Sequence, residues 1–255
     1  MTLHCEVSGS GPDLVLLHGW GMHAGVWDGL VHELSPRFRV HAVDLPGYGA
    51  SATCDPYTLE QMAAALSLQM PPHCMVCGWS LGGQVALAWA GIAPRQVARL
   101  ALIATSPCFS QRADWPHAVE AAVLRAFAEA LETDYAGTLR RFLSLQALGD
   151  ARARQVALQL RENLFSRGKP DARTLGQGLD VLLDTDLRGR LSQVTQPVLV
   201  LHGERDMLTP PAAGEYLSRN LPHAQLVKLQ GAAHAPFVAD ARGISALLIR
   251  FFDER

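Results

Sequence analysis

A serine stands at the centre of a motif that can support nucleophilic catalysis. Residues 78–82 read Gly-Trp-Ser-Leu-Gly, which matches the pattern G-x-S-x-G. A short apolar run, Met75-Val-Cys77, precedes the motif, and a helical pattern over 81–90 follows it. A sharp turn from strand to helix exposes the serine oxygen above a sheet, and flanking glycines remove side chains that would clash. We therefore predict that Ser80 is a nucleophile, against the alternative of a glycine-rich turn capped by a serine.

Ten histidines compete for the role of general base, and their positions relative to the predicted strands distinguish them. In this chemistry the chain order is serine, acid, histidine, with each partner on a loop after a strand. His234 follows a strand predicted over 225–229 through a short loop containing Gly231, so we predict it as the base. His18 is expected to shape its own turn. We expect structural or surface roles for His4, His32, His41, His73, His117, His202 and His223.

The acid that orients the base is predicted to be Asp206. It lies just beyond a strand predicted over 197–201, where its carboxylate can reach the far nitrogen of His234 and fix the tautomer. Glu204 is the nearest rival, but it stands earlier in the same turn. Asp44 is expected to shape the loop in which it lies.

An attacking serine generates a tetrahedral oxyanion that needs two hydrogen-bond donors. One predicted donor is the backbone N–H of Leu81, at the positive end of the following helix. The other is the backbone N–H of Trp20, in the run His18-Gly-Trp-Gly21 after a strand predicted over 14–17. The Trp20 indole either walls an acyl pocket or has a packing role only.

The pattern around these residues predicts an α/β fold. Apolar strand-like runs alternate with helical patterns, which implies a mostly parallel sheet with helices on both faces. The strands are predicted over 14–17, 38–43, 75–77, 100–104, 197–201 and 225–229, with a last helix over 244–252.

Residues 107–187 show helical patterns only, and we predict that they form a lid inserted into the α/β core. The core then comprises residues 1–106 and 188–255. Helices are predicted over 118–131, 134–148, 150–166 and 171–183. Asp134 and Asp150 are expected to cap the second and third of these, and Gly149 to end the second.

Composition narrows the classes of protein further. The chain has 255 residues, 49% hydrophobic and 18% charged, with a net charge of −2. A nucleic-acid binder would be strongly basic, and no apolar run is long enough for a bilayer. The first ten residues lack the basic and apolar regions of a secretory signal, so we expect a cytoplasmic protein, and a monomer without membrane or nucleic-acid partners.

Cysteine usage is consistent with this expectation. Five cysteines, an odd number, fit reduced thiols better than a disulfide framework. Cys74 and Cys77 form a C-x-x-C, but no second pair completes a zinc site, so we predict two core cysteines. We expect neither a metal nor an organic cofactor.

Together the motifs resemble the α/β-hydrolase superfamily over almost the full chain: H-G-W-G, D-L-P-G-Y-G, G-W-S-L-G-G, H-G-E-R-D and A-A-H-A-P-F. With Trp20 and the segment from Arg141 to Gln146, the combination resembles the pimeloyl-acyl-carrier-protein methyl ester esterases of biotin synthesis. That resemblance implies hydrolysis of a methyl ester on a pimeloyl chain held by an acyl-carrier protein. It implies substrate contacts from Trp20, Ser80, Leu81, Phe142, Gln146 and His234.

The predicted lid is basic, which bears on a partner. Between residues 140 and 173 it carries eight basic side chains against three acidic ones. Such a surface attracts an acidic carrier protein, and the resemblance implies contacts from Arg141 and Arg154. Gly137 and Leu158 depart from the family, since basic residues are expected there. The alternative is a solvated helix face in a chain that prefers arginine. The basic residues are Arg140, Arg141, Arg152, Arg154, Arg161, Arg167, Lys169 and Arg173.

Other activities share this scaffold. A short-chain carboxylesterase acting on small-molecule esters is the first alternative, and a carbon–carbon bond hydrolase the next. A ligand-binding homologue with a crippled triad is disfavoured by the complete set Ser80, Asp206 and His234. Dehalogenases use an aspartate at the position of Ser80.

Overall fold

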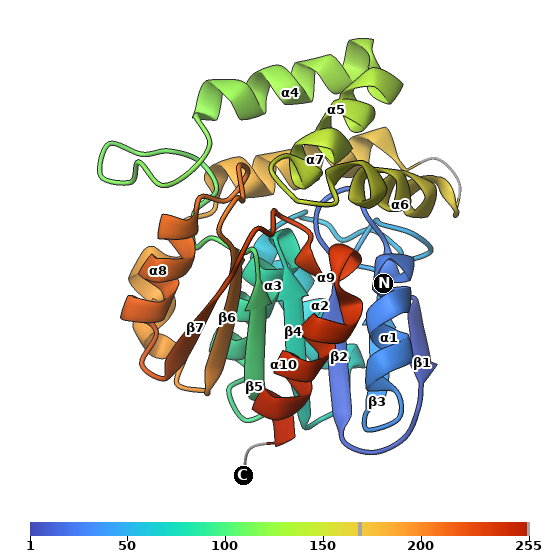
Figure 1. Ribbon diagram of the computed structural model, residues 1–255, viewed down its shortest axis with the longest axis vertical. Helices are drawn as coiled ribbons and strands as arrows, with labels where there is room; N and C mark the ends of the chain where they lie inside the picture. The colour runs from blue at the N-terminus through green and yellow to red at the C-terminus, as the bar shows by residue number, and fades with distance from the viewer. Residues whose placement is uncertain (168–169, 254–255) are drawn as a thin grey trace.

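Seven strands form one sheet within residues 1–167 and 170–253, which this computed structural model describes (Figure 1). They are β1 (Cys5–Ser8), β2 (Asp13–Leu17), β3 (Arg39–Val43), β4 (Cys74–Trp79), β5 (Val97–Ile103), β6 (Val198–Gly203) and β7 (Ala224–Leu229). Their order is β1-β3-β2-β4-β5-β6-β7, and only the β1–β3 pair is antiparallel among these strands. The predicted mostly parallel sheet is confirmed.

The central strands are buried on both sides because helices cover both faces of the sheet. On one face α1 (Asp28–Leu34), the short α9 (Pro236–Ala239) and α10 (Ala241–Asp253) pack together, while α2 (Leu59–Gln69) and α3 (Leu81–Ile92) cover the other. The remaining elements beside the sheet are η1 (Ala24–Trp27), η2 (Arg188–Gln193) and α8 (Pro211–Asn220). Within the described ranges, no helix has both the length and the apolar character needed to cross a bilayer.

Four helices of the predicted lid lie across the carboxyl edge of the sheet, at the top of Figure 1: α4 (Ala121–Thr133), α5 (Tyr135–Ala147), α6 (Ala153–Phe165) and α7 (Ala172–Asp184). Asp134 caps α5 as predicted, because its side chain accepts the Gly137 N–H. Asp171 caps α7 in the same way through Thr174.

Three predictions about elements were wrong in detail. Asp150 does not cap α6, whose N-cap is Arg152; the Asp150 carboxylate accepts the Arg152 N–H at 2.7 Å in the turn before the helix. The first lid helix begins at Ala121 rather than at 118, because Val119 forms a bridge with Ser110. The strand β1 was not predicted, because its four residues, two half-buried and two exposed, lie at a sheet edge and carry no alternating pattern.

The cysteines lie where their type predicts. All five are free thiols, and Cys74 and Cys77 are buried in β4. Burial raises the pKa of the Cys74 thiol to about 12. These two residues are therefore core side chains, as predicted.

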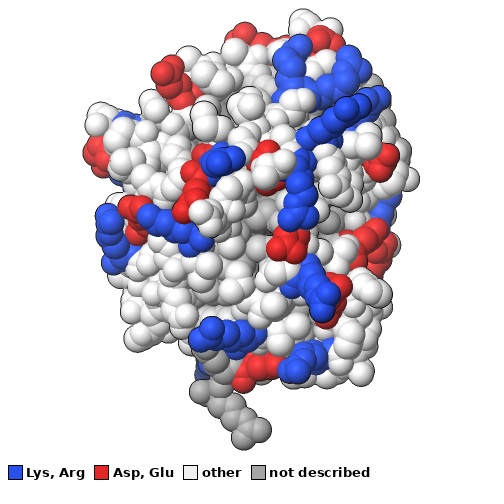
Figure 2. Space-filling view, viewed as in Figure 1, with Lys and Arg blue, Asp and Glu red and all other residues white. Residues whose placement is uncertain are grey.

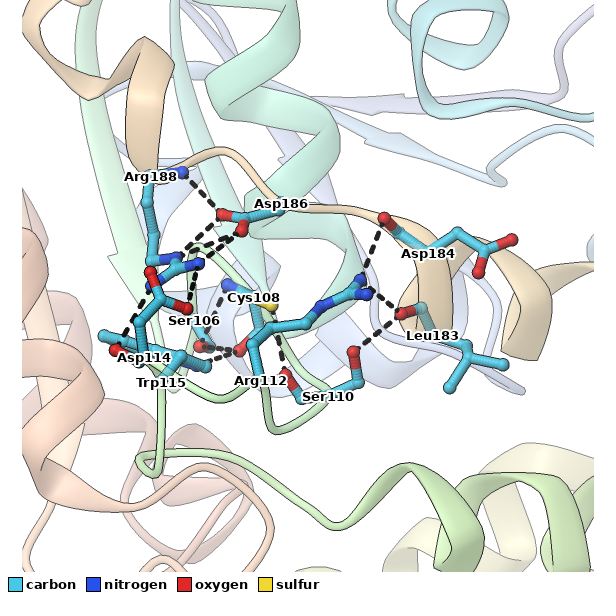
Figure 3. A network of polar contacts seen from close by, with 10 residues as sticks. All are labelled: Ser106, Cys108, Ser110, Arg112, Asp114, Trp115, Leu183, Asp184, Asp186 and Arg188. Atoms are coloured by element: carbon cyan, nitrogen blue, oxygen red, sulfur yellow. Dashed lines mark hydrogen bonds and ion pairs between the residues drawn. The ribbon is translucent and has the colours of Figure 1, made fainter.

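The two crossings between core and lid are joined by hydrogen bonds to the end of α7 (Figure 3). The Ser110 hydroxyl donates to the Leu183 carbonyl at 2.6 Å. Arg112 donates to the same carbonyl at 2.9 Å and to that of Asp184 at 3.2 Å. A cation at the last carbonyls of a helix satisfies acceptors that have no intrahelical partner.

Arg188 completes this junction. Its guanidinium pairs with Asp114 at 3.0 Å and with Asp186 at 2.7 Å, and it lies 5.3 Å from the centre of the Trp115 ring (Figure 3). The two carboxylates raise the pKa of Arg188 and lower those of Asp114 and Asp186. One side chain thus ties the outgoing segment of the lid to the returning one.

Replacing Arg188 with Ala should lower the free energy of unfolding by about 1–2 kcal/mol, because two charge-assisted contacts and one ring contact are lost. Urea unfolding of the variant measures this loss. Arg250→Ala, at an exposed position on α10, is the matched control and should change stability by less than about 0.5 kcal/mol. Equal stability of Arg188→Ala and the wild type would contradict the assigned role.

Candidate active site

The backbone at Ser80 is held in a conformation that non-glycine residues rarely adopt. Ser80 has φ +55° and ψ −119° at the turn between β4 and α3. The turn is possible because the residues two positions before and two positions after Ser80 are glycines. A Cβ on Gly78 would lie 2.4 Å from the Gly82 carbonyl oxygen, and one on Gly82 would lie 2.2 Å from that of Leu17. The predicted strand-to-helix turn with flanking glycines is therefore present, and it lifts Ser80 above the carboxyl edge of the sheet.

The structure brings Ser80, His234 and Asp206 into one chain of hydrogen bonds. His234 Nε2 lies 3.0 Å from Ser80 Oγ, and His234 Nδ1 lies 2.7 Å from Asp206 Oδ2. A carboxylate only accepts, so Nδ1 carries the proton and Nε2 is free to accept the serine O–H. The side chains are enclosed, with exposed fractions of 7% for Ser80, 1% for His234 and 3% for Asp206. Such a set can abstract a proton from Ser80.

The Asp206 carboxylate is oriented by its own turn. Asp206 Oδ1 accepts the N–H groups of Leu208 at 2.9 Å and Thr209 at 2.8 Å, which leaves Oδ2 facing His234. Glu204, the rival acid, is exposed and outside this set of contacts. His202 has a structural position: it is buried in β6, and its Nε2 lies 2.7 Å from the Thr209 carbonyl.

Two backbone N–H groups beside Ser80 have no acceptor among the described residues. Leu81 is the first residue of α3, where no earlier helical turn supplies an acceptor. Gly19, the neighbour of Trp20, is so close that a Cβ there would lie 3.3 Å from the Ser80 Cβ. No acceptor in the part of the chain that the structure describes takes up the N–H of Trp20 or Leu81. Both are available to an oxyanion.

His18 and Asp44 shape the loops beside this site, as predicted. The Nδ1–H of His18 donates to the Gly19 carbonyl at 2.8 Å, and its Nε2 accepts the Leu45 N–H at 3.0 Å. Burial lowers the pKa of His18 to about 4. Asp44 accepts the N–H groups of Ala24 at 2.6 Å and Ala50 at 2.9 Å.

An apolar cavity of about 70 Å³ leads from Ser80 under the lid. Trp20 forms one wall, where its indole N–H donates to Leu175 of α7 at 2.9 Å. Phe142 of α5 and Phe127 of α4 contact this indole edge to face, with ring centres 4.7 and 5.9 Å away. The cavity is lined by Trp20, Ser80, Phe109, Val119, Val123, Leu124, Phe127, Phe142, Leu145, Leu179, Leu182, Leu208 and His234.

Gln146 lies differently from what the resemblance implied. It does not line this cavity, although Phe142 does. Its amide is fully buried with neither polar atom hydrogen-bonded to a described residue, while its backbone carbonyl accepts the His234 N–H at 3.1 Å. This backbone contact has no local signature in the sequence, because the two residues are 88 positions apart.

Basic side chains gather over α5 and α6, at the upper right of Figure 2. Arg141 is exposed and pairs with Asp134 at 3.3 Å, and Arg154 is exposed on α6. Arg167 instead pairs with Glu6 and the buried Asp44. Lys169 lies outside the described residues. Within residues 1–167 and 170–253, no group of histidine, cysteine, aspartate or glutamate is arranged to hold a metal ion.

Comparison with known proteins gives the class. The family described as alpha/beta hydrolase fold matches residues 12–241. The fold is also that of an esterase from Exiguobacterium antarcticum, with a TM-score of 0.90 at 23% identity over 99% of this chain and 96% of that one. An enol-lactonase from Burkholderia xenovorans gives a TM-score of 0.85 at 24% identity over 99% and 96%. The chain belongs to the α/β hydrolase fold family.

Closer relatives carry a more particular name. A protein of Nitrosomonas europaea named pimeloyl-[acyl-carrier protein] methyl ester esterase is 48% identical over 93% of this chain and 94% of its own length. Relatives with the same name from Nitrosospira multiformis and Xanthomonas campestris are 40% and 45% identical, each over 98% of both chains.

Acidification should destabilise the fold through His18. In the folded protein the pKa of His18 is lowered by burial to about 4, from 6.5 when unfolded, so below pH 6.5 the unfolded state binds more protons. The sign is therefore a loss of stability as pH falls, about 2 kcal/mol from His18 between pH 7 and pH 5. Urea unfolding at these two pH values should show a smaller drop in His18→Asn, which cannot titrate. An equal drop in both proteins would contradict this account.

Proposed function

We propose that this chain is a serine carboxylesterase that hydrolyses the methyl ester of pimeloyl-[acyl-carrier protein], releasing pimeloyl-[acyl-carrier protein] and methanol in biotin biosynthesis. The observation that carries the chemistry is the hydrogen-bonded chain Ser80–His234–Asp206 at the end of an apolar cavity. Three relatives that are 40–48% identical over nearly the whole chain carry the name of this activity. These two lines of support are independent.

Each proton has a place in the proposed mechanism. His234 Nε2 takes the Ser80 proton as Oγ attacks the ester carbonyl carbon, and the resulting oxyanion accepts the N–H groups of Leu81 and Trp20. The tetrahedral intermediate collapses, the carbon–oxygen bond to methoxide breaks, and His234 returns the proton to give methanol. A water molecule then loses a proton to His234 and attacks the acyl-enzyme. Ser80 leaves with that proton, while Asp206 stabilises the imidazolium throughout.

The cavity suits the proposed acyl chain. Its walls are apolar apart from Ser80 and His234, and methylene groups are favoured against such a surface. Exclusion of water also strengthens the hydrogen bonds on which the reaction depends. Substrate contacts are proposed for Trp20 and Phe142, which line the cavity.

A carrier protein is the proposed partner on the basic face of the lid. Arg141 and Arg154 are exposed there and are proposed to contact it. Acidic proteins and phosphate groups are attracted to such a surface and pair well with guanidinium groups. The five free thiols are consistent with the cytoplasm, a reducing compartment, as the proposed location.

A second candidate is a short-chain carboxylesterase acting on small-molecule esters. The cavity favours it in one respect: among the described residues, no Asp, Glu, Lys or Arg lines the walls to recognise the far end of a substrate. A site of this kind discriminates weakly between apolar acyl groups.

Ser80→Ala should remove activity while leaving the fold intact, because the nucleophile is lost but a small side chain still fits the turn. Purified protein is mixed with methyl pimeloyl-[acyl-carrier protein], and loss of the methyl group is followed by intact-protein mass. We expect turnover by the wild type and a loss of at least about 10³-fold in the variant.

A short p-nitrophenyl ester runs alongside that assay. If the protein hydrolyses only this ester, its function is that of a general short-chain carboxylesterase. Substantial activity in Ser80→Ala, with circular dichroism like that of the wild type, would exclude Ser80 as the nucleophile.

The double variant Arg141→Ala, Arg154→Ala should raise KM for the carrier-bound ester about tenfold, since two charge contacts with an acidic partner are lost. KM for the p-nitrophenyl ester should not change, and the defect should shrink as salt is added. Arg250→Ala, an exposed arginine on α10, serves as the control. A double variant with unchanged KM for the carrier-bound ester would mean that this face is only a solvated surface.

A further inference from the structure

The turn that joins α5 to α6 contacts both loops that carry the acid and the base. This turn, residues 146–150, is called the lid corner below. It begins in the last turn of α5, where backbone carbonyls have no intrahelical partner. Gln146 uses that free carbonyl to accept the His234 N–H at 3.1 Å.

A second contact reaches the residue before the base. The Asp150 carboxylate accepts the backbone N–H of Ala233 at 3.2 Å through Oδ2, while its Oδ1 accepts the Arg152 N–H at 2.7 Å. Asp150 was predicted from the sequence as a helix cap. Its second oxygen instead spans the gap from the lid to the base loop.

A third contact reaches the residue before the acid. Arg205 donates to the Gly149 carbonyl at 3.1 Å. Gly149 has φ +92°, and a Cβ there would lie 3.1 Å from the Arg205 Cβ, so the corner lies directly against the acid loop. Glycine is suited to this position because it adopts a positive φ without strain and has no side chain to contact Arg205.

These contacts affect the distance between the base and the acid, because the two residues lie on separate loops. The loop after β6 carries Asp206 and the loop after β7 carries His234, and their side chains must stay 2.7 Å apart. From the side of the nucleophile, the Trp79 indole N–H holds the His234 carbonyl at 2.8 Å. The lid corner holds the same histidine from the opposite side and holds the acid loop as well.

We propose that Asp150 is a positioning residue, and that the lid corner sets the separation of the acid and the base through Asp150, Gly149 and Gln146. The inference rests on the proposed function only in taking His234 and Asp206 as base and acid. On this account the lid does more than cover the cavity. Any movement of α5 and α6 is transmitted to His234, so lid position and catalytic competence are linked.

The test compares Asp150→Ala with Asp171→Ala. Both remove a lid carboxylate that accepts a backbone N–H at a helix start, at 2.7 Å from Arg152 N in one case and from Thr174 N in the other. Only Asp150 also bonds to a catalytic loop. With a p-nitrophenyl ester, we expect Asp150→Ala to lower kcat about tenfold with KM within twofold, since small displacements of reacting groups are costly. Asp171→Ala should keep kcat within twofold at a comparable loss of Tm.

Three further measurements separate positioning from folding. Labelling of Ser80 by a fluorophosphonate should slow in Asp150→Ala in proportion to kcat. Asp150→Asn keeps one acceptor oxygen and so can retain one of the two N–H contacts; it should recover part of the rate. In an Asp206→Asn background, Asp150→Ala should cost less than twofold more, because residues that act through one another are not additive. If Asp150→Ala does not fold, Arg205→Ala removes the Gly149 contact from an exposed position and should lower kcat severalfold.

The inference is overturned if Asp150→Ala keeps the wild-type kcat and labelling rate, if Asp171→Ala loses as much, or if the loss is fully additive with Asp206→Asn. Absence of labelling in the wild type would overturn it together with the serine chemistry. A labelled wild type that leaves methyl pimeloyl-[acyl-carrier protein] intact would reject only the proposed substrate. The role of Asp150 would still be decided by the ester kinetics.

Discussion

The close approach of the α3 N-terminus to the end of β2 is the constraint on which the site depends. A methyl group at Gly82 would lie 2.2 Å from the Leu17 carbonyl oxygen, so only glycine permits this distance. The approach forces Ser80 into its strained conformation and places the free N–H of Leu81 beside the loop that follows β2. The proposed nucleophile and the proposed oxyanion donors are therefore positioned by one backbone contact. Side chains that arrive from β6, β7 and the lid need only be placed relative to it.

Burial gives this arrangement its chemical effect. The three side chains are buried, where electrostatic interactions are stronger than in solvent, and they form one continuous chain of hydrogen bonds. The same enclosure keeps His18 neutral, since its pKa is lowered to about 4. A neutral His18 can both donate to Gly19 and accept from Leu45, as the geometry of its turn requires. Burial thus stabilises the loop that contains His18 and also strengthens the interactions among Ser80, His234 and Asp206.

Local patterns in the sequence predict most of the core and fail where distant segments meet. Buried parallel strands such as β4 read as apolar runs, and the positions of Ser80, Asp206 and His234 follow from the order of strands and loops. Asp150 was predicted to cap a helix because its local pattern is that of a cap, and nothing nearby shows that its second oxygen binds Ala233. The backbone contact between Gln146 and His234 likewise has no local signature. Contacts between main-chain atoms of residues far apart in the sequence cannot be predicted from residue type.

The junction at the base of the lid has a consequence for how such proteins diversify. Because Ser110 and Arg112 bind the carbonyls at the end of α7, the chain leaves the core and returns to it at nearly the same point. The lid segment between these two crossings is therefore a loop inserted into the core, with its two ends held close together. The entropy cost of closing such a loop grows only slowly with its length. Helices can be gained, lost or exchanged above this closure while the sheet folds unchanged. On the account proposed above, a transplanted lid must also supply the contacts that the lid corner makes with the loops of Asp206 and His234.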